Sequence, residues 1–268
     1  MKSIRLGILA LLAIFMLACV TNPMTGRKSF QTASNSELSA AALTQYRNTL
    51  SKSKVITNTA DAKRVRSVGL KIKNAAENYY RSIGREGDLA NYNWEFNLIE
   101  NKQVNAWCMP GGKVAFYTGI MPICKDDTGV AVVMGHEVAH ALAGHGNERV
   151  SQAMVAQLGG AIIGGVMKKG TMASIFQQLY PIGAQGVILS YGRKQELEAD
   201  EMGLYLMAMA GYDPREAKAF WHRMEAGTGK SRQPEFLSTH PHPENRRADM
   251  DKHMPRALEY YKASGGKL

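Results

Sequence analysis

Two histidines and a glutamate stand close together in the run His136-Glu137-Val138-Ala139-His140. On a helix, residues four apart project from one face, so the imidazoles of His136 and His140 can both bind one zinc ion. Glu137 would lie beside that ion, where it can accept a proton from zinc-bound water and deliver hydroxide to a peptide carbonyl. The spacing therefore predicts a zinc-dependent hydrolase with one zinc ion per chain.

A catalytic zinc ion needs a third protein ligand, because its fourth position is left to water. His145 is the nearest candidate in the sequence, but its spacing is unsuitable. The metzincin pattern would place a glycine at position 143 and a histidine at position 146, and these positions hold Ala143 and Gly146. We therefore expect His145 to lie near a helix end without binding the metal.

Glu196 is a better candidate for the third ligand. Glu196 and Asp200 lie one helical turn apart, on a face that also carries the small residues Ala199 and Gly203. Small residues at such a face allow two helices to approach closely. Glu196 could then reach the zinc ion, while Asp200 accepts the second ring proton of a ligand histidine.

The elements that must position these side chains can be predicted from periodicity and capping residues. Helices are expected over about 34–53, about 60–81, from Asp126 or Asp127 to Gly144 or Gly146, over 196–210, and from Asp213 onward. Strands are expected at 94–98, 103–109 and 113–117, the last two joined by Pro110-Gly111-Gly112. The pattern predicts a mainly helical α+β domain with a small antiparallel sheet.

Two further segments complete the expected organisation. The glycine-rich segment 157–190 is too broken for one rigid helix and too short to span a bilayer, so we expect it to be helical but mobile, with its role left open. A loop over residues 238–243 precedes a last polar helix.

The chain resembles metallopeptidase family 48, the HtpX-like and CAAX-prenyl-protease group, and within it the exported Oma-like lipoproteins. Six ordered motifs carry the resemblance over nearly all of the mature chain: Asn22-Pro23-Met24-Thr25-Gly26-Arg27, Val104-Asn105-Ala106-Trp107 with Pro110-Gly111-Gly112, Gly135 to His140, Glu196 to Asp200, Ala210 to Pro214, and Thr239-His240-Pro241 with Arg246. The resemblance implies a gluzincin-type zinc metallopeptidase domain over residues 34–268.

The resemblance also implies roles for individual residues. Glu196 is the third zinc ligand and Asp200 its orienting neighbour, in agreement with the helix-face argument. Asn105 and Ala106 match an edge strand along which similar peptidases bind an extended substrate, backbone to backbone. Such binding tolerates many sequences and suits misfolded or unassembled polypeptides.

His240 and Arg246 match positions that similar enzymes use near the metal. Both side chains can donate hydrogen bonds to the oxyanion of a tetrahedral intermediate. Alternatively, a neutral His240 on a mobile loop could fill the open zinc position and hold the enzyme latent. His242 has no match in the family and is expected at the surface.

Residues 1–18 have the three-part layout of a secretory signal, with Lys2 and Arg5 before an uncharged run that ends at Cys19. The stretch Met16-Leu17-Ala18-Cys19 resembles a bacterial lipobox, in which the cysteine is acylated. We expect lipidation of Cys19 and a polar linker over residues 19–33; an ordinary cleaved signal and an uncleaved anchor are the alternatives. Val20 after the cysteine indicates the periplasmic face of the outer membrane if the host is Gram-negative.

The other two cysteines, Cys108 and Cys124, form an even pair for an oxidising compartment. They are expected either to form a disulfide or to be two buried free thiols, because the sequence does not show whether their side chains approach each other. In the family these positions commonly hold apolar residues, and the joint change favours a bond.

The formal charge of +10 falls by two, to +8, when Lys2 and Arg5 are removed with the signal. This charge favours anionic lipid or acidic partners. Aromatic and basic residues do not interleave as they do on nucleic-acid surfaces, so we expect no nucleic-acid partner. The oligomeric state is left open.

Together these features predict a zinc metalloendopeptidase of the bacterial envelope that acts on misfolded or unassembled proteins. The competing class is a chaperone or assembly factor lipoprotein that retains the zinc site and hydrolyses little. Glu137 favours the peptidase, because a purely structural zinc site does not need a base.

Overall fold

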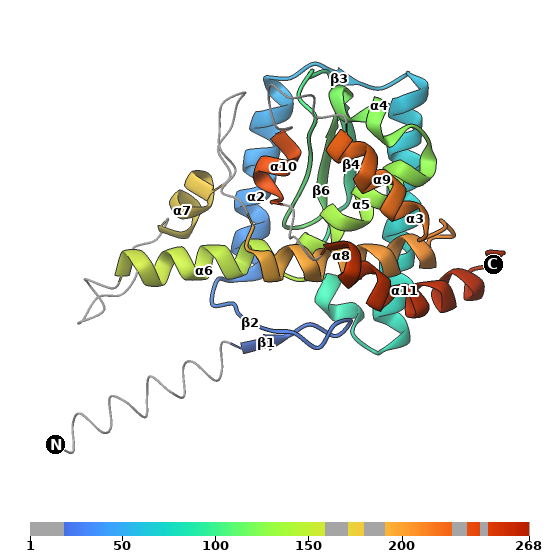
Figure 1. Ribbon diagram of the computed structural model, residues 1–268. Helices are drawn as coiled ribbons and strands as arrows, with labels where there is room; N and C mark the ends of the chain where they lie inside the picture. Colours follow the sequence, from blue (N-terminus) through green and yellow to red (C-terminus); the bar gives the residue numbers. More distant parts are fainter. Residues whose placement is uncertain (1–18, 159–170, 180–190, 227–234, 242–245, 268) are drawn as a thin grey trace.

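Helix α5 (Asp127–Leu142) carries the His136–His140 run, and its residues from Gly129 to His140 are all buried. A computed structural model describes residues 19–158, 171–179, 191–226, 235–241 and 246–267 (Figure 1). Asp126 caps α5 by accepting the backbone N–H of Gly129 (2.9 Å), and the chain turns away at Gly144, whose φ is +68°. The expected start and end of this helix are both confirmed.

A four-stranded sheet packs against α5, with the strand order β3 (Val55–Ile56), β4 (Glu95–Ile99), β6 (Lys113–Tyr117) and β5 (Ala106–Met109). The β5·β6 pair is antiparallel, as expected, whereas β4 and β6 are parallel. The strand β3, which was not expected from the sequence, pairs antiparallel with β4. After β4, the chain forms β5 at the outer edge of the sheet and then returns as β6, which lies between β4 and β5. The antiparallel β5·β6 hairpin therefore places β6 parallel to β4 and leaves β5 at an edge of the sheet.

The two faces of the sheet contact different groups of helices. Val114 and Phe116 of β6 belong to the larger core cluster, with α3 (Ala60–Ser82) and α5, whereas Ala115 faces α2 (Asn35–Ser51). Both helices begin where expected. Ser34, the predicted cap of α2, accepts the N–H of Glu37, and Thr59 caps α3 by accepting the N–H of Ala62. Short helices η1 (Glu86–Leu89), η2 (Thr118–Ile120) and α4 (Met121–Cys124) connect these elements.

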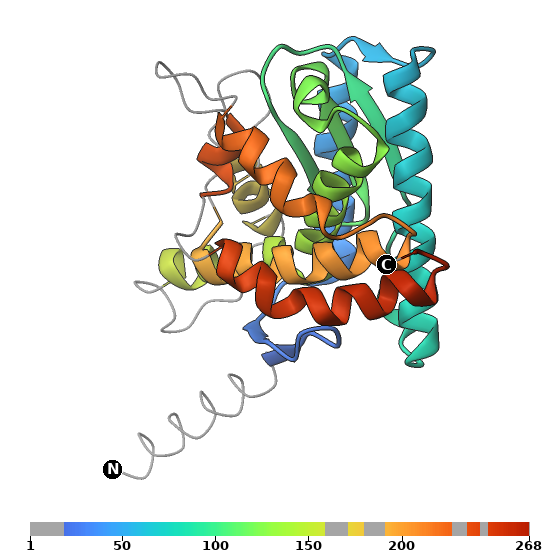
Figure 2. The same cartoon turned by 45° about the vertical axis from the view of Figure 1, so that its right-hand side comes forward.

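Helix α8 (Arg193–Met209) crosses α5 at very close range, and α11 (Arg246–Ala263) runs alongside α8 (Figure 2). A Cβ added at Gly203 would lie 3.0 Å from the backbone nitrogen of His136, and one added at Gly135 would lie 2.8 Å from the carbonyl oxygen of Gly203. The close approach that we predict from the small-residue face is therefore confirmed. The helix begins three residues earlier than expected, after Gly192.

The remaining described helices are α6 (His145–Leu158), α7 (Thr171–Leu179), α9 (Glu216–Ala226) and α10 (Glu235–Thr239). Asp213 accepts the N–H of Arg215 (3.0 Å) just before α9. Most of the glycine-rich segment 157–190 lies outside the described residues, and so does His242. None of the helices in the described ranges is long and apolar enough to cross a bilayer.

Residues 19–33, expected to be a polar linker, instead contain a two-stranded hairpin, β1 (Cys19–Thr21) and β2 (Lys28–Phe30), in which Asn22, Met24 and Ser29 are buried. The polar side chains of this hairpin form hydrogen bonds with the rest of the protein. The amino-acid composition of the segment does not reveal these contacts. The expected signal, residues 1–18, lies outside the described residues.

Cys108 and Cys124 are both free and buried, so the expected alternative of a disulfide is wrong. Cys108 lies on β5 and Cys124 ends α4. Each packs in the main hydrophobic cluster, and burial raises the pKa of both thiols. They therefore act as small core residues.

Candidate metal centre

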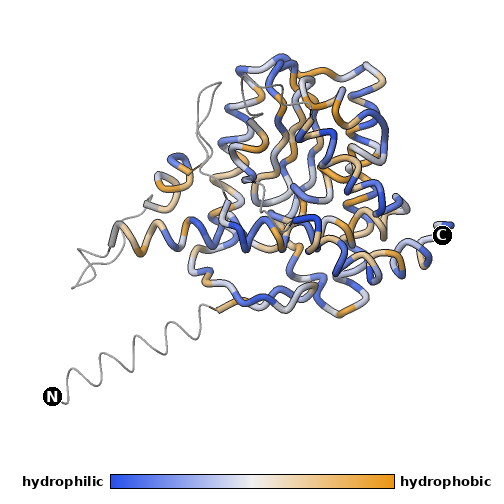
Figure 3. The backbone as a smooth tube through the Cα atoms, in the orientation of Figure 1, coloured by the Kyte–Doolittle hydropathy of each residue, from blue (hydrophilic) through white to orange (hydrophobic). Residues whose placement is uncertain are grey.

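Four buried side chains from three elements place ligand atoms together. His136 and His140 come from α5, Glu196 from α8, and His240 directly follows α10; none is more than 3% exposed. One nitrogen or oxygen of each lies within 4.8 Å of the others. Figure 3 shows hydrophilic and hydrophobic residues interleaved along α8, the helix that carries Glu196.

The distances between these atoms match a tetrahedral site. Nε2 of His136 lies 3.1 Å from Nε2 of His140 and 3.2 Å from Nδ1 of His240. Carboxylate oxygens of Glu196 lie 3.6, 3.4 and 3.1 Å from the same nitrogens of His136, His140 and His240, respectively. Zinc bonds of about 2.0–2.1 Å in a tetrahedron separate neighbouring ligand atoms by about 3.4 Å. The four side chains therefore fit one zinc ion.

The protonation states of the three sequence-predicted ligands also suit a metal. Burial lowers the pKa of both His136 and His140 well below the usual value, so both imidazoles are neutral and keep a free lone pair. Burial alone would raise the pKa of Glu196, but the neighbouring His240, His140 and His136 lower it far more. Two neutral nitrogens and a carboxylate form a donor set typical of catalytic zinc.

Glu137 is buried beside this group. Burial raises the pKa of its carboxyl to about 7, while the charge of His240 and the backbone N–H of Cys108 both act to lower it. Oε1 of Glu137 lies 3.3 Å from Nε2 of His240. A carboxylate with a pKa near neutrality is suited to accept and return a proton.

His240 lies between the two carboxylates, with Nε2 toward Glu137 and Nδ1 toward Glu196. Burial lowers the pKa of His240, but the charges of Glu137 and Glu196 outweigh burial and raise it overall. Its ring also stacks on Phe236 of α10, with 4.6 Å between the ring centroids. The histidine that the sequence left with two alternative roles is therefore held at the ligand cluster.

Asp200 and Arg246 lie behind the ligands. Oδ1 of Asp200 is 3.0 Å from Nδ1 of His136, which is the orienting contact predicted from the sequence. Arg246 is fully buried over the ring of Trp221 and pairs with both acidic residues, through Nε to Asp200 and through Nη2 to Glu196 at 3.0 Å. Its Nη1 has no hydrogen-bond partner among the described residues.

The segment that leads into the edge strand lies beside the ligand cluster. Tyr117 donates its N–H to the carbonyl of Asn105 (3.0 Å), and the antiparallel alternation then directs the backbone groups of Ala106 and Cys108 away from β6. The side-chain oxygen of Asn105 accepts the N–H of Ala106 (2.9 Å). Phe236 of α10 donates its N–H to the carbonyl of Val104 (3.0 Å), so α10 covers the start of this edge.

Sequence reasoning missed three contacts of the centre. His145, which we do not expect to be a ligand, lies behind His140 with 2.8 Å between the two Nδ1 atoms. Tyr191 stacks on the ring of His140 at 3.9 Å between centroids. The N–H of Cys108 acts on Glu137. None follows from periodicity, because each depends on how separate elements pack.

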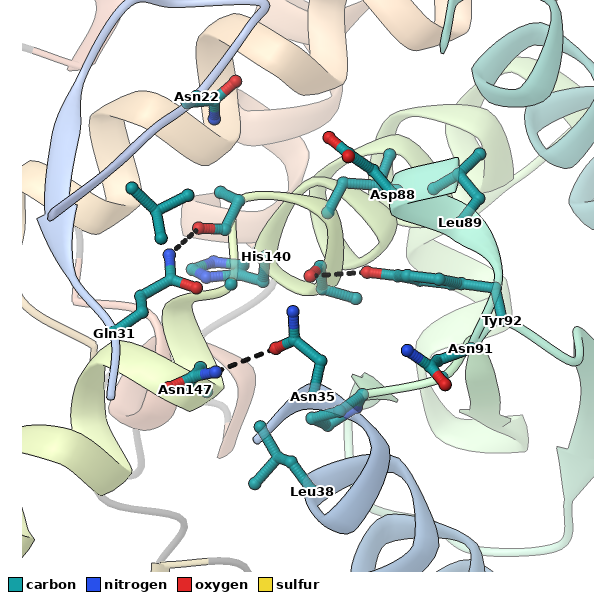
Figure 4. Close-up of a pocket in the computed structure, with 18 of the residues that line it drawn as sticks. Asn22, Gln31, Asn35, Leu38, Asp88, Leu89, Asn91, Tyr92, His140 and Asn147 are labelled. Atoms are coloured by element: carbon teal, nitrogen blue, oxygen red, sulfur yellow. Dashed lines mark hydrogen bonds between the residues drawn. The ribbon is translucent and has the colours of Figure 1, made fainter. Parts of the chain in front are cut away.

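A cavity of about 180 Å³ reaches His140 from the side of α2 and the N-terminal hairpin. Figure 4 shows His140 with Gln31 and Asn147 on one side and Tyr92 and Asp88 on the other. Cys108, Pro110 and Gly111 also line it, so the cavity borders the C-terminal end of β5 as well as His140.

Comparison with known proteins agrees with this geometry. Residues 70–254 match peptidase family M48. The mitochondrial metalloendopeptidase OMA1 of Schizosaccharomyces pombe is 34% identical over 63% of this chain and 49% of its own length. The human mitochondrial metalloendopeptidase OMA1 is 31% identical over 64% of this chain and 34% of its own length.

The beta-barrel assembly-enhancing protease of Escherichia coli is 29% identical over 58% of this chain and 33% of its own length. The chain thus spans half or less of these relatives. The family match covers more than half of the chain and contains the H-E-x-x-H run and the Glu196–Asp200 segment that build the centre. The chain therefore belongs to peptidase family M48 and is a metallopeptidase.

Proposed function

We propose that the protein is a zinc-dependent endopeptidase that cleaves misfolded or unassembled polypeptides at the bacterial envelope. The observation that carries the proposal is the meeting of His136, His140 and Glu196 in near-tetrahedral positions beside a buried Glu137. A structural zinc site would not need a carboxylate with a pKa near 7 beside its ligands.

When bound, zinc supplies a polarised peptide carbonyl and an activated water. Glu137 accepts the proton of that water and returns it to the leaving amine. Asp200 accepts the Nδ1–H of His136 and so keeps Nε2 directed at the metal. Arg246 holds the carboxylates of Glu196 and Asp200 and so fixes the third ligand and the residue that orients His136. Its role as a donor to the oxyanion of the intermediate stays a prediction.

Of the two roles predicted for His240, its position supports latency. Its Nδ1 lies where a fourth ligand would lie, which is the position that an active zinc site leaves to water. The same segment bonds to Val104 at the edge where an extended substrate would bind. Activation would then require α10 and His240 to move away together.

Backbone pairing supports polypeptide substrates with little sequence preference. Ala106 and Cys108 direct their backbone groups away from β6; because their N–H groups bond to Asn105 and act on Glu137, an extended substrate would pair with their carbonyls. Non-native chains offer the extended segments that such an edge binds. The name of the E. coli relative, a beta-barrel assembly-enhancing protease, agrees with a substrate class of unassembled envelope proteins.

The location is proposed from the N-terminal sequence. Lys2, Arg5 and the lipobox-like run ending at Cys19 support export and acylation, and Val20 supports the outer membrane of a Gram-negative host. The intact mass of the mature protein tests this. We expect a chain that begins at Cys19 with added acyl mass, and a Cys19→Ser variant without it.

Proteolysis is tested with Glu137→Gln. The variant keeps the shape of the side chain but cannot act as a base, so hydrolysis of casein should fall at least about 100-fold. Glu77→Gln, which removes a carboxylate from the surface pair with Lys73, is the matched control and should hydrolyse casein at the wild-type rate. Equal rates for Glu137→Gln and wild type would show that the mechanism is wrong.

Zinc content and proteolysis measured together test the third ligand. Glu196→Ala should lose both, because two histidines alone do not hold catalytic zinc. The chaperone or assembly factor would be favoured instead if the wild type bound zinc and prevented aggregation of an unfolded protein without cleaving it.

A further inference from the structure

The turn Asn22–Arg27 has a fixed shape next to the metal centre. It joins β1 to β2, with the N–H of Asn22 donating to the carbonyl of Arg27 (2.9 Å) and the N–H of Gly26 donating to the carbonyl of Asn22 (2.8 Å). The side-chain oxygen of Asn22 accepts the N–H of Met24 (2.9 Å). These bonds direct the polar side chains of the turn toward α8.

Three of these side chains donate to one carboxylate, Glu198. Nδ2 of Asn22 (2.8 Å) and Oγ1 of Thr25 (2.6 Å) donate to its Oε1, and Nε of Arg27 donates to its Oε2. The two Nη atoms of Arg27 pair with Glu148 of α6 at 3.1 and 2.9 Å. Glu198 is 4% exposed, so these donors fix its orientation.

Glu198 in turn holds His145, which is fully buried. Nε2 of His145 lies 2.9 Å from Oε2 of Glu198, and its Nδ1 lies 2.8 Å from Nδ1 of His140. Nε2 of His140 faces the other ligand atoms, so a neutral, metal-bound His140 carries its proton on Nδ1. His140 then donates to His145, and His145 donates to Glu198.

The other ligand histidine has a corresponding arrangement. His136 contacts Asp200, and Asp200 is held by Arg246. Each ligand histidine is therefore supported by a carboxylate that an arginine holds. For His140, the carboxylate is Glu198, which acts through His145. The arginine is Arg27 of the N-terminal turn, which is far from His140 in the sequence.

We propose that the Asn22–Arg27 turn is a positioning element of the metal centre. Arg27 orients Glu198, and Glu198 acts through His145 to orient His140 toward the metal. This proposal rests on the zinc site proposed above. Arg27, Glu198 and His145 are positioning residues and do not touch the substrate.

The test compares two variants that break different contacts of one guanidinium. In Arg27→Met, the zinc affinity of the full mature protein, measured against a fluorescent chelator, should fall about 10–100-fold, as expected when an outer partner of a ligand histidine is lost. Arg27→Lys keeps a cation beside Glu198 and should restore most of the affinity. Glu148→Gln removes the other carboxylate on Arg27 and should leave the zinc affinity unchanged.

A purely structural role for the hairpin predicts a different result. Arg27→Met and Glu148→Gln would then lower the melting temperature alike and leave the zinc affinity the same. The visible absorption of the cobalt-loaded protein gives a second measure, because it reports ligand geometry. It should change in Arg27→Met and stay as in wild type in Glu148→Gln.

A double-mutant comparison decides whether Arg27 acts through His145. In a His145→Ala background, Arg27→Met should lower the zinc affinity no further. An equal further loss in that background would overturn the proposal. If Arg27→Met does not fold, Glu198→Gln takes its place, with the same expected loss of affinity.

The zinc affinity of the wild type distinguishes a failure of this proposal from a failure of the proposed zinc-dependent function. A wild type without zinc affinity would contradict the zinc site itself. A wild type that binds zinc no more tightly than Arg27→Met and Glu198→Gln would contradict only the positioning role.

Discussion

Nε2 of His240 lies 3.3 Å from Oε1 of Glu137, the proposed base. The fourth ligand position and the base are therefore both occupied by one imidazole. Substrate could not reach either group without displacing it.

His240→Ala should raise proteolysis, because it frees the water position of the metal. We expect kcat/KM on casein to rise about tenfold, which corresponds to about 1.4 kcal/mol. His222→Ala, at an exposed position of α9, is the control and should leave the rate unchanged. A fall in kcat/KM for His240→Ala would favour oxyanion stabilisation over latency.

The pH dependence of proteolysis should report Glu137. Burial raises the pKa of this base to about 7, so it is protonated and inactive below that pH, and kcat/KM should fall as the pH drops through 7. A kcat/KM that stays constant as the pH drops through 7 would contradict this assignment of the base.

Arg246→Met should destabilise the fold, because it leaves Glu196 and Asp200 as buried carboxylates without their arginine. Breaking such a buried pair costs about 3–5 kcal/mol. Arg247→Met breaks the surface pair with Glu225 and should cost at most about 1 kcal/mol. Urea unfolding of both variants measures the difference, and equal costs would show that the buried network contributes little.

Gly203→Ala should separate α8 from α5, because its Cβ would lie 3.0 Å from the backbone nitrogen of His136. Such overpacking costs about 1–3 kcal/mol and would also move Glu196 away from the ligand histidines, so zinc affinity should fall with stability. Gly87→Ala has open space around the added carbon and is the matched control. Unchanged zinc affinity in Gly203→Ala would show that the crossing tolerates a wider spacing.

The ligand set could be predicted from the sequence because its signals are local. His136 and His140 share a helix face, and Glu196 and Asp200 share another face with Gly203, so spacing alone places them. The structure confirms the close helix crossing and the Asp200 contact to His136.

The parts that could not be predicted depend on contacts between distant segments. No periodicity shows that β6 enters between β4 and β5, which makes one strand pair parallel. Polar composition made residues 19–33 resemble a linker, although Asn22 and Arg27 bond to Glu198 of α8, more than 170 residues away. The partner of His140 was missed for the same reason, since a short loop folds His145 back behind it.

The N-terminal hairpin also sets the reach of the enzyme. Asn22 is buried against α8 and stands three residues after Cys19. Three extended residues span at most about 10 Å. If Cys19 carries a lipid, as we propose, this short segment holds the catalytic domain directly against the bilayer surface. Polypeptides would then be cleaved where they emerge at or stall on the membrane, and chains free in the surrounding compartment would escape it.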